Sequence, residues 1–408
     1  MTKLTLFAGG ILACAFLFAG AASAQTPKKT PIAVKDLPRL FDPKSLDDPK
    51  AAAAAIERLE KSYEGTRQPE AVRMLIAILR NSLSGDSGWF GPADTRYDWK
   101  WLAKRCGAES AKGIPRGKFP GGDAWFAVLD RNKDGAITAN DLDWSDRNPD
   151  VQLMGLANRM FRKINTGGNG RLTRDEMLKF FEQVAKGKDH LSPEDFRDAV
   201  LGGMSGTFMP GDAPTRAMLI RGLYEGSLGS MHEGPQLDQQ APDFTLKTVD
   251  GKETVQLSKV IGPKPVVLVL GNFTCGPFRS LYASIEGMYH RHKKDANFVM
   301  VYVREAHPSD GWKMESNTKV GVSAKQPTTL AERQAVAGQF CERLKPTMPF
   351  VVDEIDDPVG HAYSGMPGRL YVIDCQGKIA YKSGRGPFGF RFGEMEQALV
   401  MALLELKQ

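Results

Sequence analysis

Cys275 lies where a predicted buried strand ends and a predicted helix begins. Residues 265–270 form a β-branched and leucine-rich run, which is typical of a strand buried on both faces. From Phe278 onward, apolar residues recur at three- and four-residue spacing and predict one face of a helix, with Pro277 suited to its first turn. Unpaired backbone N–H groups and the helix dipole favour a thiolate there. We therefore predict a reactive, nucleophilic thiolate at Cys275; the alternative is a small, buried apolar cysteine.

The remaining cysteines bear on whether this sulfur works alone. Beyond the first 24 residues the chain has Cys106, Cys275, Cys341 and Cys375, and no two of them have CxxC spacing. This pattern disfavours a dithiol exchanger and is too sparse for a disulfide scaffold. Cys341 lies on a predicted helix, residues 333–344, and could resolve a sulfenate formed on Cys275. A packed helical cysteine without a redox role is the alternative.

Residues 130–141 carry a metal-binding pattern. Oxygen-bearing side chains at alternate positions let one short loop wrap a hard cation, and a glycine at the sixth position permits the sharp turn of an EF-hand loop. The loop has that glycine at position 135, and its predicted ligands are Asp130, Asn132, Asp134, Ala136 and Asp141. Asp141 stands where a bidentate Glu is usual. The shorter carboxylate predicts weak calcium binding or a shift towards magnesium.

A second loop of the same kind follows at residues 165–176, the spacing expected of paired EF-hands. It keeps the sixth-position glycine, and its predicted ligands are Asn165, Asn169, Arg171 and Glu176. An amide replaces the first acid, and Gly167 offers no side chain at the third position. The sequence predicts an all-α EF-hand pair over residues 121–200, with Ile137 and Leu172 meeting in a short β-bridge. A helix-loop-helix pair with one empty loop is the alternative.

Composition and the N-terminal residues limit which classes of function the chain can have. The net charge of +6 is mild for 408 residues and forms no Lys/Arg block, so nucleic-acid binding gains no support. Lys3, the apolar run at residues 4–21 and the small residues 22–24 match a cleaved signal peptide. We expect an exported protein, periplasmic or secreted. After signal removal we expect no transmembrane segment.

The second half of the chain alternates predicted strands and helices. Strands are expected at residues 298–303, 350–353 and 369–374, the last paired in a hairpin with residues 379–381, before a closing helix at residues 394–406. This order predicts an α/β sheet. The remaining segments read as a linker with helices at residues 25–120 and a connector at residues 201–235.

Residues 244–406 resemble the thioredoxin-like redoxins, and within them the iodothyronine deiodinase family. Three stretches carry the resemblance: Thr274 to Phe278, Tyr302 to Trp312, and the block formed by residues 361–363 and 368–373 with residues 384–387 after it. Cys275 stands where the animal enzymes place selenocysteine. The resemblance implies that residues 236–408 form an α/β thioredoxin-like domain, beside the all-α EF-hand pair.

The resemblance also implies roles for particular residues. Cys275 would be the nucleophile, and Glu305 and His307 a polar pair at the end of the next strand, in which Glu305 could fix the imidazole tautomer. Pro367 resembles the cis-proline that faces the active site. The residues implied for substrate binding are Thr274, His361, Pro367 and Arg369, the last for an anionic group. Turnover would need an external thiol donor or a thioredoxin-like reductant.

Three hypotheses about function follow. The first is a thiol-dependent oxidoreductase of the deiodinase-like type, in which Cys275 attacks a small molecule that is a soft electrophile, such as an aryl iodide or a peroxide. The second is a peroxiredoxin-like peroxidase, although Asn272 stands where that class places Thr or Ser. The third is a calcium-dependent interaction protein whose redoxin half is inactive, in which case the Cys275 pKa should stay near about 8.5.

Overall fold

The computed structural model describes residues 31–82, 91–108, 112–202, 212–229, 231–386 and 389–407. Ile32–Gln408 form one compact unit. The predicted signal peptide therefore lies outside the described residues. None of the described helices is both long and apolar enough to cross a membrane.

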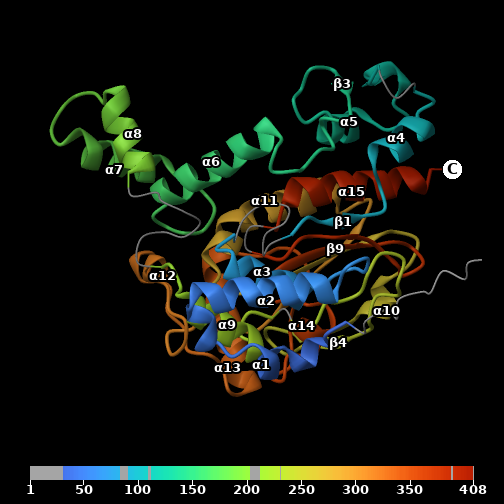
Figure 1. Ribbon diagram of the computed structural model, residues 1–408. Helices are drawn as coiled ribbons and strands as arrows, with labels where there is room; N and C mark the ends of the chain where they lie inside the picture. Colours follow the sequence, from blue (N-terminus) through green and yellow to red (C-terminus); the bar gives the residue numbers. More distant parts are fainter. Residues whose placement is uncertain are drawn as a thin grey trace, which may run out of the picture. The chain divides into compact units, whose positions relative to one another are not determined.

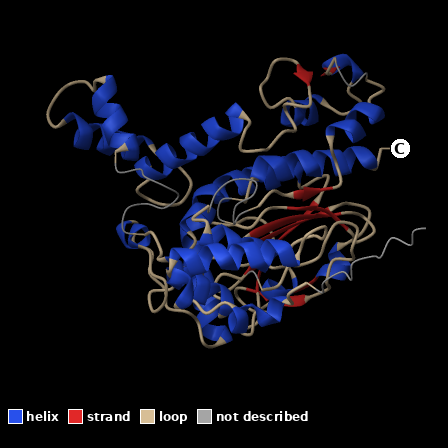
Figure 2. Cartoon of the chain, viewed as in Figure 1, coloured by secondary structure: helices blue, strands red, loops and turns tan. Residues whose placement is uncertain are grey.

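The unit is built around one mixed sheet (Figure 2). Its described strands follow the order β1-β10-β9-β6-β7-β8-β4-β5. The strands are β1 (Asp94–Thr95), β4 (Thr245–Thr248), β5 (Thr254–Gln256), β6 (Val266–Gly271), β7 (Asn297–Tyr302), β8 (Phe350–Val352), β9 (Arg369–Ile373) and β10 (Ile379–Lys382). β6 is central and buried along its whole length, as its unbroken apolar run predicts.

The centre of the sheet has thioredoxin-like topology. β6, α11 and β7 form a parallel βαβ unit, and β9 then pairs antiparallel with β6 and leads through a hairpin to β10. The helices of this half are α10 (Leu257–Val260), α11 (Gly276–His292), α12 (Glu315–Lys319), α13 (Leu330–Leu344), α14 (Pro358–Ala362) and α15 (Phe392–Glu405). This order confirms the predicted α/β sheet and the predicted terminal hairpin.

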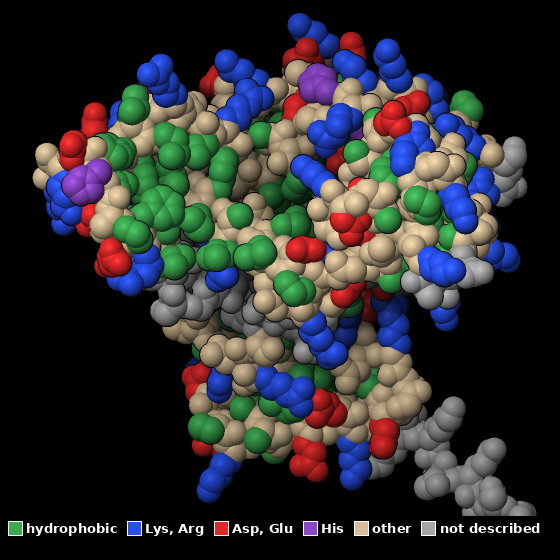
Figure 3. All heavy atoms as spheres, turned by 90° about the horizontal axis from the view of Figure 1, so that it is seen from above, with side chains coloured by type: hydrophobic (Ala, Val, Ile, Leu, Met, Phe, Trp, Pro, Cys, Tyr) green, Lys and Arg blue, Asp and Glu red, His purple; other side chains and the backbone are tan. Residues whose placement is uncertain are grey.

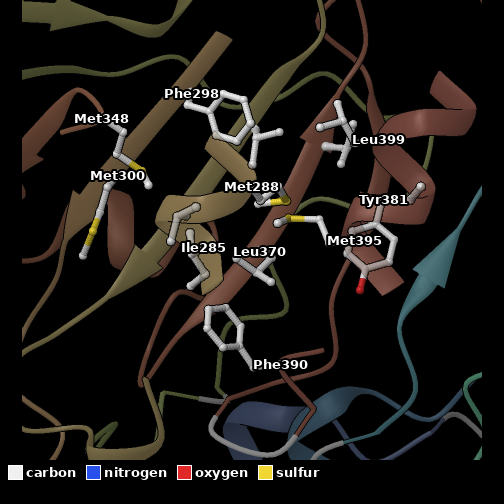
Figure 4. Close-up of a cluster of buried hydrophobic side chains, with 14 of the residues drawn as sticks. Ile285, Met288, Phe298, Met300, Met348, Leu370, Tyr381, Phe390, Met395 and Leu399 are labelled. Carbon is white, nitrogen blue, oxygen red and sulfur yellow. The ribbon is translucent and has the colours of Figure 1, made fainter. Parts of the chain in front are cut away.

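The main core lies between this sheet and helices α11 and α15. Figure 4 shows Met288 of α11 and Met395 of α15 pointing towards one another, with Leu370 of β9 and Tyr381 of β10 nearby. All four side chains are buried. Because these residues come from four elements, the core fixes the position of α11, whose N-cap residue is Cys275.

The N-terminal helices have a core of their own and also reach the sheet. They are α1 (Leu37–Leu40), α2 (Pro49–Ser62), α3 (Glu70–Leu79) and α9 (Arg216–Tyr224), preceded or joined by 3-10 turns at Val34–Asp36 and Ser45–Asp47. Leu37 and Phe41, in the segment expected to be a linker, are buried in this core. β1 extends the sheet by pairing with β10. This pairing ties the segment to the α/β region.

The predicted pairing of the two metal loops is wrong. Ile137, in β3 (Ala136–Ile137), pairs with Ile114 of β2 (Ile114–Pro115), and no bridge to Leu172 is present in the described chain. No helix follows the first loop directly, because Pro149 cannot stand inside a helix and Asn148 caps a new one at that point. The elements here are α4 (Trp99–Arg105), a 3-10 turn at Arg116–Lys118, α5 (Asp123–Leu129), α6 (Pro149–Ile164), α7 (Arg174–Ala185) and α8 (Pro193–Leu201).

Helices α6, α7 and α8 bury little of their own apolar surface. Their buried residues are Ile164, Ala185 and Val200. Large apolar side chains are exposed on all three helices, namely Leu153, Met177, Leu178, Phe196 and Leu201. Figure 1 shows these helices grouped together, and Figure 3 shows hydrophobic side chains gathered on the face seen from above. Contacts to other parts of the chain therefore matter for holding this segment in place.

Candidate active site

Asn272 joins the three segments that surround Cys275. Its Oδ1 accepts hydrogen bonds from the backbone N–H of Cys275 (3.0 Å) and of Ala306 (3.2 Å). Its Nδ2 donates to the carbonyl of Pro367 (2.9 Å), and the Met366–Pro367 peptide bond is cis, as the resemblance implies. Cys275 itself is the N-cap residue of α11, in the short turn that follows the end of β6 at Gly271. The predicted strand-to-helix placement of the cysteine is confirmed.

Thr274 and Glu305 form a buried pair beside the cysteine. The backbone N–H and Oγ1 of Thr274 donate to Glu305 Oε2 (2.8 and 2.7 Å), and the Tyr302 hydroxyl donates to the other carboxylate oxygen. Burial raises the pKa of Glu305, and these hydrogen bonds oppose the rise. Since Thr274 and Glu305 are both buried, the hydroxyl expected to contact substrate instead positions Glu305.

His307 is held by Trp312 rather than by Glu305. Its backbone N–H donates to Thr274 Oγ1 (2.9 Å), which brings the residue to the turn. Its Nδ1 lies 3.2 Å from the carbonyl of Trp312, so Nδ1 carries the hydrogen and Nε2 is left as an acceptor. Burial lowers the pKa of His307 to about 4, and the ring is neutral at pH 7. The expected role of Glu305 in fixing the imidazole tautomer is therefore wrong, because that carboxylate is occupied by Thr274 and Tyr302.

The Cys275 sulfur is protonated in this arrangement, contrary to the predicted thiolate. The side chain is 1% exposed, and burial raises its pKa to about 11. Three groups lower the pKa: the backbone N–H of Phe278, the positive charge of Arg279 and the positive charge of Arg162. The helix dipole favours the thiolate at the helix end, but burial by the rest of the chain outweighs it here.

Arg279 and Asn317 are site residues that the sequence interpretation missed. The Arg279 guanidinium donates to the carbonyl of Phe273 and to Asn317 Oδ1 (2.7 Å). Asn317 Nδ2 in turn donates to the carbonyl of Thr274 (2.7 Å). Both carbonyls that precede Cys275 are thereby held. One signal was available, because Arg279 lies four residues after Cys275 and so on the same helix face, among apolar neighbours.

Arg369 does not face a substrate site. Its guanidinium is 3% exposed and lies 2.7 Å from Glu70 Oε1, which also accepts from Arg385 Nε at 2.7 Å. Burial alone would raise the pKa of Glu70, but the two arginines lower it to about 2. The expected anion site is thus filled by a carboxylate of the chain itself, from α3.

Neither His361 nor Cys341 contacts Cys275 in the described residues. His361 is exposed on α14, and its ring centroid is 4.9 Å from that of His232. Cys341 is half-buried on α13 and its thiol is free, and burial raises its pKa to about 11. Its electrostatic neighbours are Glu342 and Tyr282. A direct resolving role for Cys341 would require this arrangement to change.

Gly271 permits the close packing that sets the first turn of α11. A Cβ at this position would lie 2.2 to 2.5 Å from three ring atoms of Phe278. We expect Gly271→Ala to lower the free energy of unfolding by about 1–3 kcal/mol, because the ring must move in a packed core. Chemical denaturation measures this. Gly262→Ala is the matched control, since nothing lies within 4 Å of its Cβ position, and equal losses in both variants would contradict the prediction.

The donor set of the first loop suits a hard cation, although its side chains are not assembled around one point. Asp130 and Asp141 are buried, and their carboxylates accept from backbone N–H groups of Gly135 (3.0 Å) and Thr138 (2.8 Å). In the described part of the chain neither they nor Asp134 form an ion pair, and Arg131 pairs with Asp150 instead. Across the described residues, no group of three or more His, Cys, Asp or Glu side chains is placed to hold a metal ion.

The second loop does bring its predicted ligands together, but around an amide. Asn165 Nδ2 lies 2.8 Å from the carbonyl of Arg171, 3.1 and 3.3 Å from the two oxygens of Glu176, and 3.4 Å from Asn169 Oδ1. These oxygens occupy the fifth, seventh and twelfth positions of the loop. The space that a cation would take is filled by the side chain at the first position, so the residues do not fit calcium.

Comparison with known proteins places the C-terminal region. The family model of iodothyronine deiodinase matches residues 216–402. Type II iodothyronine deiodinase of Sus scrofa is 34% identical over 155 residues, which cover 38% of this chain and 57% of that protein. Thyroxine 5-deiodinase of Gallus gallus is 29% identical over 177 residues, 43% of this chain and 67% of that protein. The chain thus spans little more than half the length of the first relative.

Solved structures similar to this chain include the exposed lipoprotein thioredoxin Etrx1 of Streptococcus pneumoniae, with a TM-score of 0.27 and 20% identity over 40% of this chain and 99% of that one. The sheet order described above, and not this likeness, indicates the fold. Together with the family match, it identifies residues 216–402 as a deiodinase-like region built on a thioredoxin-like fold.

Proposed function

We propose that this protein is a thiol-dependent oxidoreductase of the deiodinase-like type, acting on a small molecule through Cys275. The observation that carries the proposal is the position of Cys275 at the start of α11, with Asn272 connecting it to the cis-Pro367 segment, inside the region that matches the deiodinase family. Backbone N–H groups at a helix start stabilise a developing thiolate.

The proposed chemistry is a two-electron reduction of an aryl iodide. The Cys275 thiolate attacks iodine, an S–I bond forms, the C–I bond breaks and its electron pair stays on carbon, which takes up a proton. An external thiol then displaces iodide from sulfur and forms a mixed disulfide. A second thiol releases Cys275 and leaves the external thiols as a disulfide. Because Cys341 has no described contact with Cys275, we propose an external thiol or thioredoxin-like reductant for both steps.

The thiolate must form by relief of burial. Burial is the largest cause of the raised Cys275 pKa, whereas the Phe278 N–H, Arg279 and Arg162 all favour the anion. Entry of substrate or water beside the sulfur would reduce the burial penalty and leave those three groups in place. The thiol proton then leaves to the water that enters, because burial lowers the pKa of His307 to about 4 and makes its ring a weak base.

Turnover assays on the full chain test this proposal. Wild type and Cys275→Ser are compared for release of iodide from an iodothyronine and for consumption of peroxide, each with dithiothreitol. We expect the variant to lose turnover, because a serine hydroxyl cannot attack iodine or cycle through a disulfide, and Cys375→Ser, at the far hairpin, to retain it. Full activity of Cys275→Ser in both assays would refute the proposal; loss of peroxide consumption alone would replace it with a peroxidase.

We also propose that the first loop, residues 130–141, binds calcium. The proposal is supported by its carboxylates, which have no cationic partner in the described chain, and by the EF-hand spacing. Calorimetry should show about one site per chain, with a dissociation constant on the order of 10⁻⁴ to 10⁻³ M for calcium and Asp130→Asn removing it. Two equal sites, or a site that survives Asp130→Asn, would contradict this.

We further infer that the protein is exported, on the strength of the signal-peptide pattern at residues 1–24. Fractionation of expressing cells, with N-terminal sequencing of the mature chain, tests this. A chain that starts at Gln25 outside the cytoplasm is the expected result, and an uncleaved cytoplasmic chain would overturn it.

A further inference from the structure

The second loop rests directly on the start of the cysteine helix. A Cβ added to Gly170 would lie 2.6 Å from the carbonyl oxygen of Ser280 and 2.9 Å from that of Arg279, and the φ of Gly170 is +73°. A Cβ added to Gly168 would lie 3.1 Å from the side chain of Val320. The loop backbone therefore makes close contact with the second turn of α11 and with the end of α12, where side chains at these glycines would prevent it.

Hydrogen bonds continue from this loop to the Cys275 turn. Arg343 of α13 donates to the carbonyl of Gly167 at 2.7 and 3.2 Å, and Arg279 Nε donates to that of Gly168 at 3.4 Å. The same Arg279 guanidinium holds the carbonyl of Phe273 and, through Asn317, that of Thr274. A continuous set of contacts thus leads from the loop to both carbonyls that precede Cys275.

The interior of the loop is closed by one amide group. Asn165 is buried, its Nδ2 faces the loop oxygens described above, and its Oδ1 accepts from the backbone N–H of Gly170 at 3.1 Å. That donor fixes the orientation of the amide, since rotating it would set Nδ2 against an N–H group. Glu176 also accepts a hydrogen bond from the backbone N–H of Gly167 at 2.6 Å. Gly167 is the residue whose carbonyl accepts from Arg343. The loop is therefore satisfied internally, and a cation would meet N–H hydrogens at its centre.

We propose that residues 165–176 form a calcium-independent clasp on the Cys275 turn, closed by the Asn165 amide and connected to the turn through Arg279 as a positioning residue. The small buried core of α6–α8 supports this, because a segment with little core of its own depends on such contacts. The proposal rests on the proposed function only in taking Cys275 as the working thiol.

The first test makes the clasp depend on calcium. In a background of Asp130→Asn with Asp134→Asn, which disables the first loop, Asn165→Asp replaces the amide by a carboxylate that repels Glu176 and can bind calcium. The rate of Cys275 alkylation by iodoacetamide is followed by mass spectrometry of its peptide. In EGTA we expect about a tenfold faster rate for Asn165→Asp, the effect of losing one or two hydrogen bonds. Calcium should restore the slow rate.

The background protein without Asn165→Asp is the matched control, and its rate should be the same in calcium and in EGTA. A calcium response in this control would overturn the claim of calcium independence. An Asn165→Asp rate that stays at the control value in EGTA would overturn the clasp. Because alkylation needs no turnover, these outcomes are separate from loss of the proposed activity.

The second test addresses Arg279 and does not depend on the loop variant folding. Arg279→Lys keeps the charge but cannot hold several carbonyls, so we expect about tenfold faster alkylation with little change in its pH midpoint. Arg279→Gln should also raise the pH midpoint of alkylation, because it removes a positive charge that favours the thiolate. Arg162 and Glu305 then remain as the charged groups that act on the thiol. Arg291→Lys, at a half-exposed site on the same helix, is the control. Arg279→Lys that alkylates like Arg291→Lys would overturn the positioning role.

Discussion

Glu70→Gln should lower the free energy of unfolding by about 3–5 kcal/mol, the effect of removing one partner from a buried ion pair. Arg369 and Arg385 are buried, and in the described chain Glu70 is the carboxylate that pairs with both. The glutamine has nearly the same size but no charge, so two guanidinium groups would be left in the interior without a counter-charge. Urea denaturation at pH 7 measures the loss.

The acid limb of the stability curve provides a second measurement. The pKa of Glu70 is lowered to about 2 in the folded chain, so its contribution is present above the unfolded-state value and is lost as pH falls towards 2. Over that range the wild type should lose about 3 kcal/mol through this group, and Glu70→Gln should lack that loss.

A surface glutamate on the preceding helix serves as the control. Glu57 of α2 is exposed, and its replacement by Gln should change stability by less than about 0.5 kcal/mol. If Glu70→Gln costs no more than this, or if its acid limb matches the wild type, the buried ion network does not stabilise the fold as we expect.

The elements next to Cys275 could be predicted because their signals are local. An unbroken apolar run gave the central strand, three- and four-residue spacing gave the helix, and the proline after Cys275 fits its first turn. The terminal hairpin followed from the turn at residues 376–377. Each of these depends on residues within one element or two adjacent ones.

The partners of the site residues could not be predicted, because they come from distant parts of the chain. Glu70, which neutralises Arg369, is separated from it by 299 residues, and no local pattern links the two. Trp312 rather than Glu305 orients His307, because the Glu305 carboxylate already accepts a hydrogen bond from Thr274. The predicted bridge between the two metal loops is wrong for a similar reason. Ile137 pairs with β2, which lies in a segment whose irregular sequence does not indicate a strand.

Tertiary burial, and not the helix start alone, sets the ionisation of Cys275, and this has a large expected effect on how its alkylation rate depends on pH. With a pKa of about 11, the Cys275 thiol is almost entirely protonated at pH 7. Its alkylation rate should therefore rise about tenfold per pH unit from pH 7 and level off near pH 11, whereas a free cysteine levels off near about 8.5–9. Unfolding in urea should move the Cys275 midpoint to that lower value.

The same shift predicts how stability changes in alkali. The folded pKa of Cys275 is raised above the unfolded value of about 9, so the contribution is complete below pH 9 and is lost as pH rises towards 11. Two pKa units correspond to about 2–3 kcal/mol, and Cys275→Ser should lack this alkaline loss. Cys375→Ser, at a more exposed thiol, should keep it. A Cys275 alkylation midpoint near about 8.5 in the folded protein would mean that the sulfur is open to water and that burial does not set its pKa.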